Sequence, residues 1–286
     1  MGLTLAWHCL NLGASVRVID PNGIANGASG GIVGALAPHV PENWNAKKQF
    51  QLESLLYSQK FWKSVDSVSG LNSGYRRTGR LQPLMDEHSV ALAQKRKESA
   101  DNLWQNFATW DIIDNSKDWN LTSPTGLWIF DTLSAIIYPK LACLSLAQAL
   151  KNKGCEFLLD GKNLGKVIWA TGIHDLNRIS IKLEKNFGNG VKGQAALFKL
   201  TKPNSVQLFA ETLHFIPHFD GTVAIGSTSE RNFEHENTND DNLNALILKA
   251  SNILPELKGK DPICTWANVR TRSSSRAPVL LSLIHI

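Results

Sequence analysis

An acidic residue, Asp20, closes a short run of β-branched residues near the start of the chain. This run, Val16 to Ile19, follows a stretch with a helical apolar face, residues 3–12, which Gly13 ends. In nucleotide-binding βαβ units an acid lies about 20 residues beyond the glycine-rich loop, after the second strand. Gly2 has that spacing from Asp20 if it is the last glycine of a G-x-G-x-x-G loop. The pattern therefore predicts the second half of a nucleotide-binding unit.

The two ends of the sequence predict a chain that is cut at both ends. The first strand and the earlier glycines would lie upstream of Met1, and without them the phosphate cradle is half built. The last six residues, 281–286 (LSLIHI), read as the translation of a sequencing-library adapter. We therefore expect a fragment of a longer protein.

Two further segments have unusual composition. Residues 27–39 (GASGGIVGALAPH) are too rich in glycine to start a stable helix and too apolar for a solvated linker. Backbone of this kind can approach a ligand closely. Residues 166–170 (KVIWA), followed by Thr171 and Gly172, have the pattern of a buried strand that ends in a tight turn.

The rest of the chain alternates between helical and strand patterns. Helices are expected near residues 50–65, 90–107 and 243–254, and strands near 127–130, 155–159, 194–200, 206–210, 213–218 and 222–227. This order predicts an α/β chain of two interleaved domains. An incomplete, Rossmann-like nucleotide-binding domain would comprise residues 1–75, 135–182 and 265–286. An α+β substrate domain on an antiparallel sheet would comprise residues 76–134 and 183–264.

The bulk composition is that of an ordinary globular protein. Apolar residues make up 43% and charged residues 19% of the 286 residues, which argues against disorder. The net charge of +5 favours acidic partners, but the basic residues are scattered, and Lys95–Lys97 fit a solvated helix face. The four cysteines form no C-x-x-C pair and have no histidine at metal-ligand spacing, so no metal is assigned and a reducing, cytoplasmic location is expected. No apolar run approaches the roughly 20 residues that span a bilayer.

Six strings occur in one order: VRVID, GASGGIVGAL, VIWATG, VKGQ, FIPHFDGTVAIGSTSE and WANVRTRSSSRAP. Together they resemble the D-amino-acid oxidase-like flavoprotein family, most closely in its glycine oxidase pattern, over nearly the whole chain. The resemblance implies FAD as the cofactor, so that the nucleotide-binding domain is an FAD-binding domain. The C-terminal half is also similar to the FAD domain of the bifunctional tRNA 5-methylaminomethyl-2-thiouridine modification protein.

The resemblance implies roles for the candidate cofactor residues. Asp20 would hold the ribose hydroxyls, since a carboxylate can accept two hydrogen bonds from a vicinal diol. The other candidates beside Gly2 would pack on the pyrophosphate and flavin (Gly27, Ala28 and Ser29), approach the flavin ring (Gly34, Ala35 and Leu36) or leave room for the dinucleotide (Ala170, Thr171 and Gly172). The plainer interpretations are a solvated turn acid, a packing segment of small residues and an ordinary buried strand.

The resemblance also implies substrate residues. Arg270 aligns with the arginine that anchors the substrate carboxylate, and a planar guanidinium suits bidentate carboxylate binding. Arg272 takes this role if the register is off by two; the plainer interpretation is a surface arginine. His214 falls where glycine oxidase has an active-site tyrosine, and it would hydrogen-bond the substrate or tune the protonation of its amine; an ordinary strand histidine is the alternative. His218 is expected to be the more exposed of the two histidines.

The implied reaction is oxidation of the C–N bond of an amino acid or secondary amine. Hydride leaves the substrate carbon for the flavin, the imine is hydrolysed, and electrons pass to oxygen or another acceptor. One alternative is the tRNA-modifying function, with tRNA as a partner. An alternative of another class is a nucleotide-binding fragment without catalytic activity.

Overall fold

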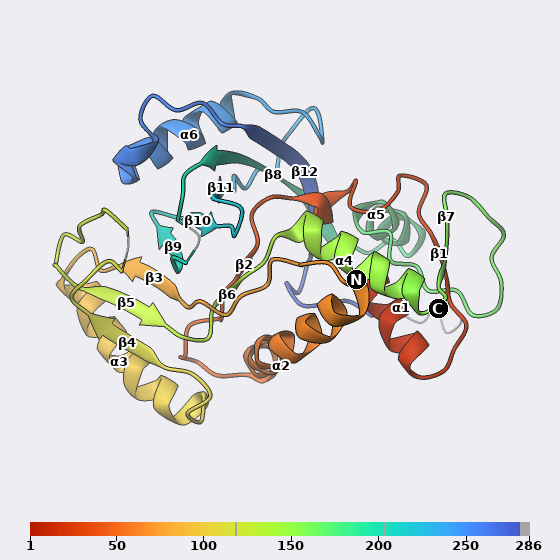
Figure 1. The fold of residues 1–286 in the computed structure, drawn as a ribbon, viewed down its shortest axis with the longest axis horizontal. Coiled ribbons are helices and arrows are strands. Elements are labelled where there is room, and N and C mark those ends of the chain that lie inside the picture. The colour runs from red at the N-terminus through yellow and green to blue at the C-terminus, as the bar shows by residue number, and fades with distance from the viewer. Residues whose placement is uncertain (118, 203, 281–286) are drawn as a thin grey trace.

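A computed structural model describes residues 1–117, 119–202 and 204–280. The expected adapter-derived segment, 281–286, lies outside these residues. The described chain contains three β-sheets, of two, eight and two strands, with helices packed around them (Figure 1). No described helix is long and apolar enough to cross a membrane.

A two-stranded parallel sheet lies near the N-terminus. It pairs β1 (Arg17–Ile19) with β7 (Glu156–Leu158). Helices α1 (Gly2–Asn11), α2 (Ala46–Ser69) and α4 (Pro139–Asn152) pack beside it through a shared apolar cluster that includes Trp7, Val65 and Leu150. Gly13 follows α1 with a positive φ of 85°, which a glycine adopts without strain. The predicted helix, turn, strand and acid are therefore present in that order.

The eight-stranded sheet is the largest element. Its order is β12-β8-β11-β10-β9-β3-β5-β4, and all neighbours are antiparallel except β3 and β9. The strands are β3 (Arg80–Pro83), β4 (Trp110–Ile113), β5 (Trp128–Asp131), β8 (Gly188–Lys199), β9 (Gln207–Ala210), β10 (Leu213–Pro217), β11 (Thr222–Gly226) and β12 (Cys264–Ser273). The predicted α/β class is confirmed, and the sheet is mixed rather than wholly antiparallel. Strand β12 pairs with β8 along ten residues, although the predicted division places 265–286 in the other domain; that division stays a prediction.

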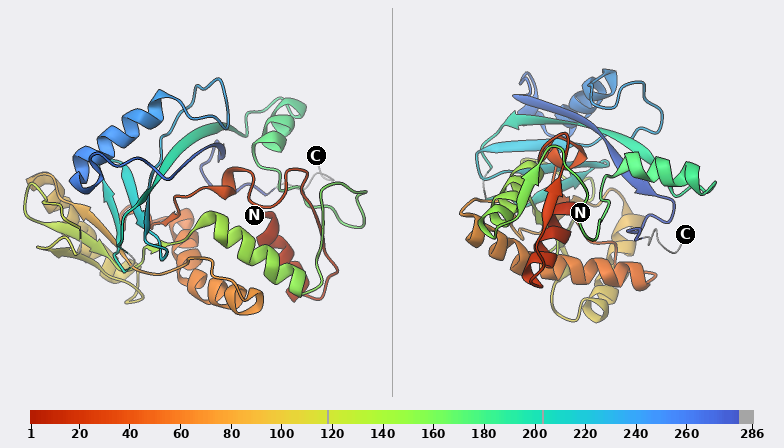
Figure 2. Two further views of the ribbon diagram at one scale, coloured as in Figure 1. Left: turned by 45° about the horizontal axis from the view of Figure 1, so that its top comes forward. Right: turned by 90° about the vertical axis from the view of Figure 1, so that its right-hand side faces the viewer.

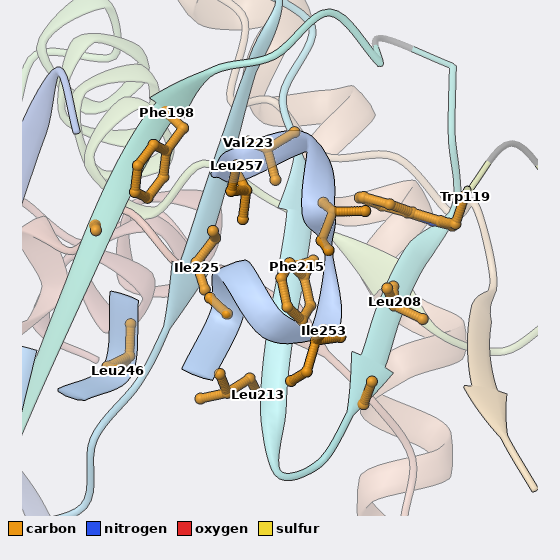
Figure 3. Packing of buried hydrophobic residues seen from close by; sticks show 14 of the residues in the cluster. Trp119, Phe198, Leu208, Leu213, Phe215, Val223, Ile225, Leu246, Ile253 and Leu257 are labelled. Atoms are coloured by element: carbon orange, nitrogen blue, oxygen red, sulfur yellow. The ribbon is translucent and has the colours of Figure 1, made fainter. Parts of the chain in front are cut away.

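Helix α6 (Asp241–Ile253) covers one face of this sheet. Its Leu246 and Ile253 pack with Phe198, Phe215 and Ile225 from the strands, as Figure 3 shows. Helix α5 (Ile173–Lys182) packs on β8 and β12 at the other end of these long strands (Figure 2). Helix α3 (Glu87–Leu103) packs with α2 on a second core around Trp104 and Trp110, and it ends four residues earlier than expected.

The expected buried strand at residues 166–170 is absent. These residues have no strand conformation and all are exposed; the Trp169 side chain is 48% exposed. A strand needs a neighbour that satisfies its backbone groups. Among the described residues the small parallel sheet contains β1 and β7 alone, and residues 166–170 pair with neither of them. Apolar composition was therefore not enough to make this segment a strand.

The small-residue segment contains a 3-10 turn, η1 (Ala28–Gly30), and β2 (Ala35–Leu36), which pairs with β6 (Ala135–Ile136). A Cβ on Gly34 would stand 2.0 Å from the Ile137 carbonyl oxygen, and one on Gly30 would stand 1.9 Å from the Ala25 carbonyl oxygen. These two glycines are therefore required for close contact between backbone segments, whether or not a ligand is present.

His218 ties the small-residue segment to the large sheet. It is 3% exposed, so the expectation that it is the more exposed of the two histidines is wrong. Its Nε2 lies 3.0 Å from the Ile32 carbonyl oxygen, and its ring stacks on Tyr138 at 4.1 Å. Burial lowers the pKa of His218 to about 4. The imidazole is therefore neutral at ordinary pH, and Nε2 donates its proton to the carbonyl.

We predict that Gly34→Ala destabilises the protein. The added methyl cannot fit against the Ile137 backbone, and overpacking of this kind costs about 1–3 kcal/mol. Chemical denaturation would measure the loss. Gly27→Ala is the matched control, because a Cβ there meets no heavy atom within 4 Å. Equal stability of the two variants would contradict the packing argument.

We also predict acid destabilisation through His218. The unfolded chain binds a proton near the ordinary pKa of 6.5, whereas folded His218 resists it until about pH 4. Stability is therefore complete above pH 6.5 and falls as the pH drops towards 4, by up to roughly 3 kcal/mol. His218→Phe keeps the stacking and should make this slope shallower in denaturation measured across pH, while His214, whose pKa is also about 4, keeps its own part of it. His88→Phe, at an exposed position, is the control; an unchanged slope in His218→Phe would refute the assignment.

Candidate functional site

Arg270 lies on the face of the large sheet opposite α6. Its Nη2 donates to the Thr228 carbonyl oxygen at 2.9 Å. The guanidinium lies over Gly193 of β8, where a Cβ would stand 3.2 Å from Cζ, Nε and Nη2. Desolvation, and then the charge of Arg272, lower the pKa of Arg270, which stays a cation. Because its partner is a neutral carbonyl, its charge remains available to an anion.

His214 lies on the same face, on β10. It pairs with Gly226, which pairs with Ala195 on β8, and residues in register share a face. Its ring lies 4.6 Å from that of Phe209. Its Nδ1 is buried and has no hydrogen-bond partner among the described residues. Burial, and then the charge of Arg80, lower the pKa of His214 to about 4, so the ring is neutral.

The two predicted substrate residues do not touch each other. Gly193, under the guanidinium, lies two strands and two residues away from His214 in the pairing pattern. With spacings of about 4.8 Å between strands and 3.3 Å along them, this corresponds to roughly 12 Å on a flat sheet. Between them the Val33 side chain lies over Gly226, where a Cβ would stand 3.2 Å from Val33 Cγ2.

A buried ion pair borders this face. Arg80 Nε lies 3.0 Å from Asp131 Oδ2, with side chains 8% and 0% exposed. The Arg80 guanidinium also lies 5.9 Å from the centre of the Phe209 ring. Asp131 forms an ion pair with Arg80. The positive charge of Arg80 still lowers the pKa of His214.

Asp20 and Gly2 lie at the small parallel sheet. The Asp20 amide donates to the Leu158 carbonyl at 3.0 Å, so Asp20 follows directly on the paired part of β1. Its Oδ1 accepts from the Asn22 amide at 3.1 Å, whereas no hydrogen bond to Oδ2 is present in the described chain. Gly2 begins α1, whose N-terminal amides suit an anion. These donors and acceptors fit the phosphates and the ribose of a dinucleotide.

The other predicted cofactor residues approach β12 at two points. Ala170 lies beside Gly2, because a Cβ added to Gly2 would be 3.4 Å from the Cβ of Ala170. A Cβ added to Gly172 would be 3.3 Å from Thr271 Oγ1. After Gly27, Ala28 and Ser29 in the η1 segment, a Cβ on Gly31 would be 3.5 Å from the Trp266 ring. Residues Gly34, Ala35 and Leu36 run on into β2. The structure thus brings Gly2 together with Ala170, and it brings both glycine-rich segments to the strand that carries Arg270.

Sequence reasoning missed the residues that hold Arg270 in place. Gly193 stands in the VKGQ string, but the missing side chain is meaningful only once β8 and β12 are paired. The Thr228 carbonyl is a backbone group and leaves no signal in the sequence. No group of three metal-ligating side chains lies together in the described part of the chain.

The comparisons with known proteins agree with this fold. The sequence model of the FAD dependent oxidoreductase family matches residues 1–283. Glycine oxidase from Pseudomonas putida is 34% identical over 93 residues, 32% of this chain and 25% of that protein. The tRNA 5-methylaminomethyl-2-thiouridine biosynthesis bifunctional protein of Hydrogenovibrio crunogenus is 27% identical over 121 residues, 41% of this chain and 17% of that protein. The matches thus span a quarter or less of these curated relatives.

Solved structures share the fold over nearly the whole chain. Glycine oxidase from Geobacillus kaustophilus has a TM-score of 0.82 at 14% identity and covers 98% of this chain and 82% of its own. Iminodiacetate oxidase from Chelativorans sp. BNC1 has a TM-score of 0.78 at 17% identity, with 97% and 83% covered. The family match extends from the first residue through β12, the strand that carries Arg270. It shows that the chain belongs to the FAD-dependent oxidoreductase family.

Proposed function

We propose that the protein oxidises the C–N bond of an amino acid or a related secondary amine. The observation that carries this proposal is the Arg270 guanidinium, which lies over Gly193 and faces the same side of the sheet as neutral His214. A permanent cation suits a substrate carboxylate, and an unprotonated imidazole suits the neighbouring amine. The similarity to glycine oxidase and iminodiacetate oxidase supports an amino-acid or amine substrate.

FAD, the cofactor of the family, supplies the hydride acceptor when bound. We assign its ribose to Asp20 and its phosphates to the N-terminus of α1 at Gly2 and to the segment of Gly27, Ala28 and Ser29. Gly34, Ala35 and Leu36 would lie towards its ring, and Ala170, Thr171 and Gly172 would border the dinucleotide.

Arg270 orients the substrate through its carboxylate, which is a contribution of positioning. His214 accepts or donates a hydrogen bond at the amine. Because its pKa is about 4, it does not act as a strong base at neutral pH. The substrate amine must therefore lose its proton to water or before binding. The electrons finally leave the site for oxygen or another acceptor.

A second candidate function is the removal of a substituent from a tRNA wobble uridine. The match to the tRNA-modifying bifunctional protein and the net charge of +5 favour it. Tight, salt-sensitive binding of tRNA by the full-length protein would support this function. If the full-length protein lacked flavin absorbance, the alternative of a non-catalytic nucleotide-binding protein would stand.

The four unpaired cysteines are consistent with a cytoplasmic location, which we also propose.

We predict that Asp20→Asn weakens FAD binding by roughly 10- to 100-fold in the full-length protein. The lost hydrogen bonds to a charged group are each worth about 1.5–3 kcal/mol. Titration of the flavin-free protein with FAD, followed by flavin fluorescence, would measure the dissociation constant. Asp160→Asn, at an exposed acid beyond β7, is the matched control. Equal affinities in both variants would rule out the ribose role.

We predict that Arg270→Gln raises KM for amino acids by about 100-fold, since a lost charge-assisted carboxylate contact costs about 1.5–3 kcal/mol. The test mixes the FAD-loaded full-length protein with glycine and other amino acids without oxygen and follows the loss of flavin absorbance. Arg272→Gln is the matched control and should change KM by only a few-fold. A larger effect at Arg272 would move the anchor by two residues, and no bleaching by any amino acid or amine would refute the proposed function.

A further inference from the structure

The Thr228 carbonyl, which accepts the hydrogen bond from Arg270, belongs to a segment, residues 228–230, that is hydrogen-bonded to β8. The amide of Thr228 donates to the Gln194 carbonyl at 3.1 Å. The backbones of Lys192 and Glu230 exchange two hydrogen bonds of 3.0 Å. Residues 228–230 therefore continue the sheet beyond β11, and the position of the carbonyl depends on them.

Side chains on the α6 face fix the same segment. Lys192 is 1% exposed, and its Nζ lies 2.6 Å from Asp240 Oδ2. Gln194 Nε2 donates to Asp240 Oδ1 at 2.6 Å and to Glu230 Oε1 at 3.0 Å, and its Oε1 accepts from the Asp240 amide at 3.0 Å. Thr228 Oγ1 also donates to Glu230 Oε1. The hydrogen bond from Lys192, above all, holds the pKa of Asp240 well below its usual range.

The network and the arginine lie on opposite faces of one short segment of β8. Side chains alternate along a strand, so Lys192 and Gln194 point towards α6 and Gly193 lies under the guanidinium. Residues 192–194 thus connect the cap of α6, where Asp240 also accepts from the Asn242 amide at 3.0 Å, to the surface on which Arg270 rests.

A buried lysine is an expensive way to attach a helix. Removing its charge from water costs several kcal/mol, and an apolar pair would pack α6 as well. Asp240 would cap α6 without it. What the ionic network adds is a fixed geometry among Asp240, Gln194 and Glu230.

We propose that this network, Lys192, Gln194, Glu230 and Asp240, is a positioning device for Arg270. It fixes the Thr228 carbonyl so that one guanidinium N–H is held there and the others stay directed at the substrate carboxylate. Lys192 is thus a positioning residue that never meets the substrate. This inference rests on the proposed role of Arg270.

The experiment compares variants of the FAD-loaded full-length protein. Lys192→Met keeps the aliphatic stem and removes the charge, Lys192→Arg restores it, and Lys199→Met at the exposed end of the same strand is the control. The probe is acetate, a bare carboxylate, titrated by calorimetry; KM and kcat for an amino acid are measured alongside. Glu230→Ala is a second variant that leaves the buried Lys192–Asp240 pair intact.

Lys192→Met should weaken acetate binding and raise KM by about 10-fold while kcat stays within twofold, since only binding of the carboxylate is weakened. Lys192→Arg should restore both to within threefold, Lys199→Met should match the wild type, and Glu230→Ala should weaken acetate binding by about threefold. In an Arg270→Gln background, Lys192→Met should have no further effect on acetate.

Two results would overturn the positioning role, and they differ from failure of the proposed function. If Arg270→Gln weakens acetate binding and the Lys192 and Glu230 variants do not, the network only attaches α6 to the sheet. If Lys192→Met fails to fold, unchanged acetate binding in Glu230→Ala leads to the same conclusion. If Arg270→Gln itself leaves acetate binding unchanged, the anchor and the network proposal both fail.

Discussion

The pairing of β12 with β8 is the constraint on which the rest of the site depends. Ten residue pairs fix the register of these strands, and this register places Arg270 over Gly193. The same strand meets the glycine-rich segments at Trp266 and Thr271, so it connects the candidate cofactor residues to the candidate anchor. A slip of one residue would turn Arg270 to the α6 face, where apolar side chains and helices cover the sheet.

Desolvation sets the charge of the two buried histidines on this face of the sheet. Burial keeps His214 and His218 neutral, with pKa values of about 4, but their neighbours differ. His218 has a carbonyl partner and a stacked tyrosine, which makes it a structural tie, whereas Nδ1 of His214 has no partner in the described residues. An unsatisfied buried nitrogen is costly, and a ligand that satisfies it recovers this cost.

Local patterns in the sequence predicted the elements, and long-range contacts decided the rest. The periodic helices α2 and α6 and the strands around Asp220-Gly221 occur where the apolar pattern placed them, because each signal is contained in a few neighbouring residues. The KVIWA segment has strand composition without a strand partner, which composition alone does not reveal. His218 is hydrogen-bonded to Ile32, and Lys192 forms an ion pair with Asp240. In both cases the partner is far away in the sequence, so no local pattern predicts the contact.

The charge of the site follows from how each cation is paired. Asp131 neutralises Arg80 at a buried site, and the partly exposed Asp240 neutralises the buried Lys192. Arg270 instead donates to a neutral carbonyl, so its charge is not cancelled by that contact. An anion on this face of the sheet is therefore attracted by the oriented Arg270 guanidinium and also by the charge of Arg272, two residues further along the same strand. The carboxylate substrate that we propose needs only such a localised charge, whereas a nucleic acid backbone would require several phosphate contacts spread over an exposed basic patch.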